Sequence, residues 1–275
     1  MRAMGKELVK RYVLGALARP ALQGALGQAH RMVLAGMNIG TGGHVSSSGE
    51  RTVLERLAAV CPPGAAPVVF DVGANVGDFA RHASSAWGAR ARLYCFEPSR
   101  GAFARLRDNV TGLPGVELVP MGLGAATSEA LLYADRDGSE LASLYPRATF
   151  AAGGEPRTET VPITTLDAFC AEHDVRRIDY LKLDVEGHEL AVLEGGRAMI
   201  EADRVDCIQF EFGGCNIDSR TYMRDFFAAL TPRYLLHRIV RGGAYPLERY
   251  SERLEVFVTT NYLAVRRASA YASAL

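Results

Sequence analysis

The stretch that decides the fold reads V-V-F-D-V-G-A-N-V-G and covers residues 68–77. The apolar run that ends at Asp71 is typical of a short strand buried on both faces, as in a parallel sheet. Gly73 permits a sharp turn after this strand, and Gly77 allows the following helix to approach closely. The N–H groups at the start of that helix are then free to face a ligand. The stretch therefore predicts the first strand–turn–helix unit of a ligand-binding α/β domain.

The same alternation of strands and helices continues on both sides of this unit. It predicts right-handed crossovers and a doubly wound, mostly parallel sheet of seven strands. A helix that begins near Thr164 is expected to have Thr165 as its cap. The other helices are predicted at 50–60, 77–87, 99–109, 189–200 and 219–230, and the strands at 68–70, 92–96, 116–120, 178–183, 205–212, 234–240 and 254–260, with two short strands at 130–133 and 159–163 that flank a loop at 134–157.

Length and charge limit the possible partners. The 275 residues suit one α/β domain with extra segments. The chain has 31 basic and 31 acidic residues, and its formal net charge is zero. A protein that binds DNA or RNA usually has a basic excess, so we expect no nucleic-acid partner. The five cysteines form no C-x-x-C pair, which argues against a zinc site and favours a reducing, cytoplasmic compartment.

The first 44 residues differ from the rest of the chain. Six basic residues lie there with a single acidic residue, Glu7. The apolar stretch at 12–18 is too short for a signal peptide, and no uncharged run approaches the ~18 residues of a membrane span. We expect residues 1–44 to form a helical segment or lid on a cofactor-binding domain at 45–275. A weak role at a membrane surface is the alternative, without stable insertion.

Four of the predicted strands end in an acidic residue. These residues are Asp71, Glu97, Asp184 and Glu211. Ligands of open α/β sheets bind outside the carboxyl ends of the strands. The four carboxylates are therefore expected to line one site.

The turn after the first strand indicates which cofactor binds there. A dinucleotide fingerprint would have glycine at position 75, where the backbone must approach a pyrophosphate closely, but this chain has Asn75. S-adenosylmethionine has no pyrophosphate, and its amino-acid part suits exposed backbone groups beside a carboxylate. Glu97, followed by Pro98, is placed to accept the ribose hydroxyl groups. These residues favour S-adenosylmethionine over NAD or FAD.

The segment D-V-E-G-H-E at 184–189 follows the fourth core strand and carries the candidate catalytic groups. A hydroxyl that attacks a methyl group must lose its proton, so a base or a metal ion is useful there. Asp184 is the preferred base, and His188 is the second candidate. Asp184 and Glu211 could instead hold Mg²⁺, although their spacing is not diagnostic.

Taken in order, these motifs resemble the FkbM family of methyltransferases. The resemblance covers roughly residues 45–215. It implies a class I fold with strand order 3-2-1-4-5-7-6 and an antiparallel last strand. It also implies methyl transfer to a hydroxyl of a sugar, glycolipid or polyketide, with the methionine part bound by Asp71, Gly73, Asn75 and Gly77, and the ribose bound by Glu97. The motifs that carry the resemblance are V-F-D-V-G-A-N-V-G at 69–77, F-E-P at 96–98, T-L-D at 165–167, I-D-Y-L-K-L-D-V-E-G-H-E at 178–189, L-E-G-G at 193–196 and the strand that holds Glu211.

Other functions remain open at this stage. The first hypothesis is an O-methyltransferase that acts on a small-molecule or glycosyl acceptor. The alternatives are an N- or C-methyltransferase, a nicotinamide oxidoreductase, which Asn75 disfavours, and a non-catalytic module that binds S-adenosylmethionine. A homodimer is possible, because twofold dimers are the most common oligomers.

Overall fold

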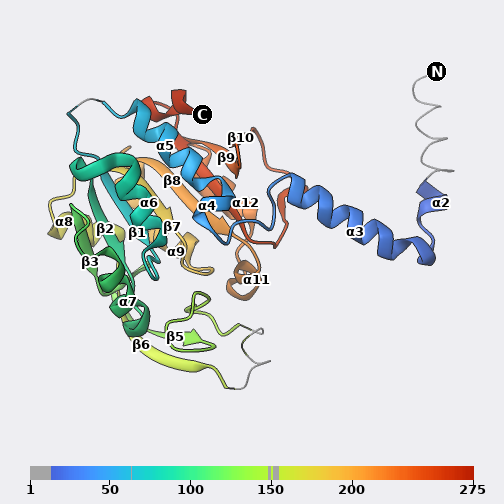
Figure 1. The fold of residues 1–275 in the computed structure, drawn as a ribbon, viewed down its shortest axis with the longest axis horizontal. Coiled ribbons are helices and arrows are strands. Elements are labelled where there is room, and N and C mark those ends of the chain that lie inside the picture. The colour runs from blue at the N-terminus through green and yellow to red at the C-terminus, as the bar shows by residue number, and fades with distance from the viewer. Residues whose placement is uncertain (1–13, 63, 148–149, 151–154) are drawn as a thin grey trace.

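The computed structural model describes residues 14–62, 64–147, 150 and 155–275. A large mixed sheet lies between two layers of helices, and a helical arm projects from one side (Figure 1). The helices are α2 (Gly15–Leu17), α3 (Pro20–Gly36), α4 (Val45–Ser48), α5 (Glu50–Val60), α6 (Asp78–Trp87), α7 (Arg100–Val110), α8 (Leu166–Glu172), α9 (Glu189–Gly195), α10 (Arg197–Glu201), α11 (Cys215–Ser219) and α12 (Met223–Leu230). The strands are β1 (Val68–Val72), β2 (Arg92–Phe96), β3 (Val116–Val119), β4 (Gly122–Leu123), β5 (Ser128–Ala134), β6 (Arg157–Thr164), β7 (Ile178–Leu183), β8 (Val205–Phe212), β9 (Tyr234–Val240), β10 (Gly243–Leu247) and β11 (Thr260–Arg266).

The main sheet confirms the predicted α/β class. Its eight strands lie in the order β10-β9-β11-β8-β7-β1-β2-β3. Without β10, the strands lie in the chain order third, second, first, fourth, fifth, seventh, sixth. Strands β1, β2, β3, β7 and β8 are parallel, whereas β11 is antiparallel to both of its neighbours, β8 and β9. The carboxyl ends of the parallel strands therefore meet at one edge of the sheet.

Two apolar cores hold the layers together. One core joins the sheet to α5, α6 and α7, with Leu57 and Trp87 among its buried residues. The other core joins the opposite face to α8, α9, α10 and α12, and in it Phe169 lies against Phe70 and Phe96. Both faces of the central strands are thus covered, which explains their continuous apolar sequences.

Two sequence predictions about the C-terminal half were wrong. The last strand is Thr260–Arg266 and not 254–260. Glu255 accepts hydrogen bonds from the N–H groups of Met223 and Arg224 at the start of α12, so its segment serves as a cap and does not join the sheet. Strand β10 was not predicted, and it contains Pro246, a residue that is tolerated on an edge strand.

Two predicted helices differ in the structure. The helix expected at 189–200 consists of α9 and α10, which are separated at Gly196. The helix expected at 219–230 begins later, as α12 at Met223, and Ser219 is instead the last residue of α11. Arg220, between the two helices, has a positive φ of 57°. The cap at Thr165 is confirmed, because its hydroxyl accepts a hydrogen bond from the N–H of Ala168.

Helix α3 contains no buried residue and extends away from the domain (Figure 1). Its side chains Met32 and Val33 are 68% and 60% exposed. The lid expected from residues 1–44 stays a prediction, because residues 1–13 lie outside the described residues. No helix among residues 14–62, 64–147, 150 and 155–275 is long and apolar enough to cross a bilayer.

Candidate functional site

The turn after β1 forms one wall of a pocket at the carboxyl edge of the sheet. Gly73 has a φ of +82°, and a Cβ added to it would lie 1.9 Å from the carbonyl oxygen of Asp184. Only glycine allows the backbone that follows β1 to approach the end of β7 this closely. Asn75 also has a positive φ, 45°, a conformation that asparagine tolerates better than most residues. Both residues line the pocket.

Gly77 and Asp71 do not line this pocket. A Cβ on Gly77 would lie 2.8 Å from Val110 and 2.9 Å from Leu106, so this glycine allows α6 to approach α7. Asp71 is fully buried behind the turn, and its pKa is raised by burial against the lowering effect of Lys182. The resemblance implies that both residues bind the methionine part, and the structure places Gly77 against α7 and Asp71 beside Lys182.

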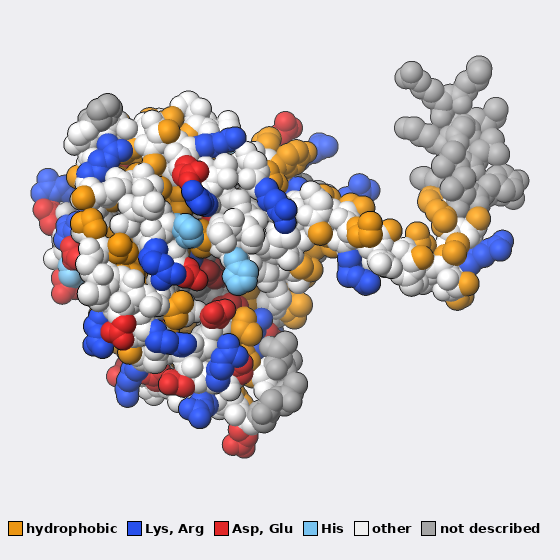
Figure 2. Space-filling model, viewed as in Figure 1, with side chains coloured by type: hydrophobic (Ala, Val, Ile, Leu, Met, Phe, Trp, Pro, Cys, Tyr) orange, Lys and Arg blue, Asp and Glu red, His pale blue; other side chains and the backbone are white. Residues whose placement is uncertain are grey.

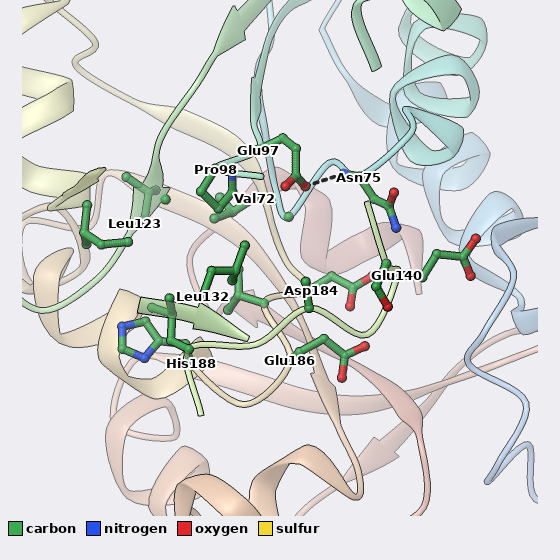
Figure 3. A pocket seen from close by; sticks show the side chains of 17 residues that line it. Val72, Asn75, Glu97, Pro98, Leu123, Leu132, Glu140, Asp184, Glu186 and His188 are labelled. Atoms are coloured by element: carbon green, nitrogen blue, oxygen red, sulfur yellow. Dashed lines mark hydrogen bonds between the residues drawn. The ribbon is translucent and has the colours of Figure 1, made fainter. Parts of the chain in front are cut away.

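Glu97 is held in place by two backbone N–H groups. Asn75 N donates to one carboxylate oxygen of Glu97 at 2.9 Å (Figure 3). Ser99 N donates to the other carboxylate oxygen, also at 2.9 Å. Burial raises the pKa of Glu97 to about 7, although both hydrogen bonds lower it. Each oxygen keeps a lone pair, so the carboxylate can accept two further hydrogen bonds. Glu97 and Pro98 both line the pocket.

Asp184 lies at the centre of the pocket, beyond the end of β7 (Figure 3). Its Oδ2 is 3.0 Å from Nζ of Lys182, and the same Nζ lies 3.5 Å from Oδ1 of Asp71. Burial would lower the pKa of Lys182, but the carboxylates of Asp184, Asp71 and Glu50 raise it above its ordinary value. Lys182 is therefore a buried cation that joins the first and fourth core strands. Sequence analysis missed it, although a lysine within the apolar run I-D-Y-L-K-L is a recognisable signal.

His188 lies away from Asp184, at the apolar end of the pocket near Leu123 and Leu132 (Figure 3). Its Nδ1 is 3.0 Å from the hydroxyl of Tyr145, and burial lowers its pKa. The two candidate bases are thus on different parts of the pocket wall.

The segment 139–147 closes the pocket opposite the sheet. Ser139, Glu140 and other residues of this segment line the cavity. The Ser143 hydroxyl donates to the carbonyl oxygen of Glu186 at 2.7 Å, and Arg147 forms a 2.8 Å ion pair with its carboxylate. Glu186 has a φ of 52°, which is unusual for this residue type and is maintained by these contacts. The sequence predicted a loop here but not the residues that it brings to the site.

Among the described residues, one cluster has candidate metal-ligand atoms that all lie within 4.8 Å of one another. It consists of Glu186, Glu211 and Cys215 and does not include Asp184. Mg²⁺ prefers oxygen ligands in octahedral geometry, whereas this set includes a thiol whose pKa is raised by burial. Arg147 already neutralises Glu186. These residues do not fit Mg²⁺, and no catalytic step is assigned to a metal.

Comparison with known proteins gives a consistent result. A family model described as the methyltransferase FkbM domain matches residues 71–234. The hexuronic acid methyltransferase AglP of Haloferax volcanii is 31% identical over 133 residues, which cover 46% of this chain and 49% of that protein. The 2-O-methyltransferase NoeI of Sinorhizobium fredii is 29% identical over 153 residues, which cover 50% of this chain and 60% of that protein. The chain thus spans about half the length of these curated relatives.

Solved structures with a similar arrangement were also found. A SAM-dependent O-methyltransferase from Thermotoga maritima has a TM-score of 0.41 and 13% identity, covering 80% of this chain and 65% of that chain. Aeropyrum pernix fibrillarin, solved with natively bound S-adenosyl-L-methionine, has a TM-score of 0.41 and 13% identity, covering 78% of this chain and 76% of that chain.

Proposed function

Because the chain belongs to the FkbM methyltransferase family, we propose that it transfers the methyl group of S-adenosylmethionine to a hydroxyl group of a sugar or a related glycosyl acceptor. The observation that carries this proposal is the pair of carboxylates in one pocket. Glu97 is fixed by the N–H groups of Asn75 and Ser99, and Asp184 faces the same cavity. One carboxylate suits a ribose, and the other suits a reacting hydroxyl.

The pocket has a suitable place for each part of the cofactor. The ribose hydroxyls would donate to the free lone pairs of Glu97. The amino-acid part would lie along Gly73 and Asn75, and the adenine would occupy the apolar end beside Leu123 and Ile163. The sulfonium group would then lie near Asp184. A cation at this point would be favoured by the carboxylate of Asp184, which lines the same pocket.

In the proposed reaction an acceptor oxygen attacks the methyl carbon in line with the carbon–sulfur bond. The new oxygen–carbon bond forms as the carbon–sulfur bond breaks. The electron pair of the carbon–sulfur bond remains on sulfur, and the cofactor becomes S-adenosylhomocysteine. The acceptor proton passes to the carboxylate of Asp184. Holding the two reactants in line supplies much of the rate. Lys182 keeps one oxygen of Asp184 in place while the other remains available to the acceptor.

The acceptor class is supported by the relatives. The names of AglP and NoeI describe a hexuronic acid methyltransferase and a 2-O-methyltransferase. To test the proposal, the purified chain is incubated with methyl-labelled S-adenosylmethionine and a panel of free and lipid-linked sugars, hexuronic acids included, beside an amine panel. Label on a sugar hydroxyl supports the proposal. Label on amines alone would replace it with N-methylation, and a folded protein that binds S-adenosylhomocysteine but labels neither panel would contradict it.

Cofactor binding should depend on pH through Glu97. Ribose hydroxyls donate hydrogen bonds, so they prefer the ionised carboxylate, and bound ligand should lower the pKa of Glu97 from about 7. Binding then releases a proton below that pH. We expect the affinity for S-adenosylhomocysteine to rise by up to about tenfold between pH 6 and 8 and then to level off. Calorimetric titration across this range measures the effect.

Glu97→Gln provides the matched control for this pH dependence. The variant keeps the size of the side chain but cannot ionise, so its weaker binding should be independent of pH between 6 and 8. If the variant keeps the wild-type pH profile, the profile has another origin and Glu97 does not bind the ribose.

A further inference from the structure

Helix α3 has an uninterrupted apolar face that nothing in the described chain covers. At 3.6 residues per turn, one arc of about 140° contains only apolar residues and glycine. Met32 and Val33 on this arc are 68% and 60% exposed. The polar residues Gln23, Gln28, His30 and Arg31 lie outside this arc, where Pro20, Leu34 and Ala35 are the apolar exceptions. The residues of the apolar arc are Ala21, Leu22, Ala25, Leu26, Ala29, Met32, Val33 and Gly36.

The helix is firmly attached at its base and projects beyond it (Figures 1 and 2). The Asn38 side chain donates to the carbonyl oxygens of Ser48 and Ile239, at 2.6 and 3.0 Å. Beyond this anchor α3 contains no buried residue. Most of the stability of helices in proteins comes from packing of an amphipathic face. The exposed apolar face of α3 is therefore a candidate contact surface for a partner.

The apolar surface continues from the helix onto the domain. Met37 at the end of α3 and Val258 are 40% and 41% exposed. Val258 adjoins Gly40, since a Cβ on that glycine would lie 2.9 Å from Val258 Cγ1. The neighbouring residue Phe257 contacts the ring of Tyr222, which is 40% exposed. Arm and domain thus offer one continuous apolar surface.

The distribution of charge along the chain indicates which kind of partner the apolar face of α3 binds. Residues 1–44 contain six of the 31 basic residues and one of the 31 acidic residues, which leaves 25 basic against 30 acidic residues in the rest of the chain. No acidic residue occurs between positions 8 and 49. A second copy of this arm would bring together two segments of the same positive charge. An anionic lipid surface attracts each basic residue and accepts an apolar helix face at the level of its headgroups.

We propose that α3 and the exposed residues at its base bind the surface of an anionic membrane, with the apolar arc inserted among the headgroups. The polar side with Gln23, Gln28 and Arg31 then remains in water. This docking does not depend on the reaction proposed above. It would hold the domain beside the bilayer without a spanning segment.

Vesicle flotation with the full chain tests this docking. Vesicles of phosphatidylcholine alone are compared with vesicles of phosphatidylcholine and phosphatidylglycerol, at low and high salt. We expect at least about tenfold stronger binding to the anionic vesicles at low salt, and a marked loss at high salt. Equal binding to both vesicle types, or none to either, would overturn the proposal.

Two neutral variants separate the apolar face from the charge. Met32→Ser with Val33→Ser removes two large side chains from the arc, and we expect about tenfold or greater loss of vesicle binding. Gln23→Ser with Gln28→Ser introduces the same residues on the polar side and should bind like the wild type. Both variants should unfold at the wild-type temperature, because all four positions are exposed.

The competing partner, a second copy of this chain, predicts a different result. Light scattering after size exclusion would show a dimer for the wild type and a monomer for the Met32/Val33 variant, without vesicle binding by either protein. That pattern would assign the face to dimerisation and reject the membrane. A monomeric wild type that floats only with anionic vesicles supports the membrane.

Discussion

Asp184→Asn is expected to lower kcat for methyl transfer by about 10²- to 10⁴-fold, the range that a positioned general base contributes. The substitution keeps the size of the side chain and leaves an amide oxygen beside Lys182, which lies 3.0 Å from Asp184 in the native chain. It removes the capacity to accept the acceptor proton, together with one of the negative charges beside Lys182. The affinity for S-adenosylhomocysteine should stay within about threefold, because Glu97 and the turn at Gly73 are unchanged.

His188→Asn is the matched control for this loss. His188 lies at the apolar end of the pocket and its Nδ1 is beside Tyr145, so its replacement should change kcat much less than Asp184→Asn. Single-turnover assays at saturating cofactor, with calorimetry for binding, separate the two effects. If Asp184→Asn retains near wild-type turnover, or if His188→Asn shows the larger loss, Asp184 is not the base.

Lys182→Met should destabilise the fold by about 3–5 kcal/mol, the cost of leaving a buried ion pair without one partner. Lys182 is 4% exposed, and it is the cation between Asp71 and Asp184. Without it, burial raises the pKa of Asp71 unopposed, so the folded variant binds protons more readily than the unfolded chain. Stability is then lost as pH rises, and the deficit should be greater at pH 8 than at pH 5. Urea unfolding at both pH values measures the difference.

The double variant Asp71→Asn with Lys182→Met gives the control for this prediction. Removing the buried carboxylate together with its cation should restore part of the lost free energy of unfolding and reduce its pH dependence. If Lys182→Met unfolds within 1 kcal/mol of the wild type at pH 8, the lysine is not the required counter-ion.

The sequence predicted the fold correctly where one short segment determined both its own secondary structure and the burial of its residues. Helices cover both faces of the strand at 68–72, which explains its apolar residues. The acidic residues at the strand ends were predicted from the same apolar runs, because each of them follows or ends such a run. Segment 254–260 misled because its alternation resembles that of a strand. Glu255 and Phe257 instead contact α12 and Phe212, which are distant in sequence.

The site residues that the sequence did not predict also depend on contacts between segments that are distant in sequence. The position of Lys182 between two carboxylates depends on the register of β1 and β7, which pairs Asp71 with Lys182. The contacts of Ser143 and Arg147 with Glu186 join segments about 40 residues apart. The arm shows the opposite case, since amphipathic spacing predicts the helix α3 but does not say what covers its apolar face.

The contact between Gly73 and the carbonyl oxygen of Asp184 has a consequence for how such a site can diversify. With no room for even a methyl group between them, the backbone that follows β1 and the backbone at Asp184 behave as one rigid piece. A substitution that shifts either segment alone would clash with the other. Segment 139–147, which lines the opposite wall of the pocket, is not restrained by this contact. Variation in that segment can therefore reshape the pocket while the spacing between the turn and Asp184 is preserved.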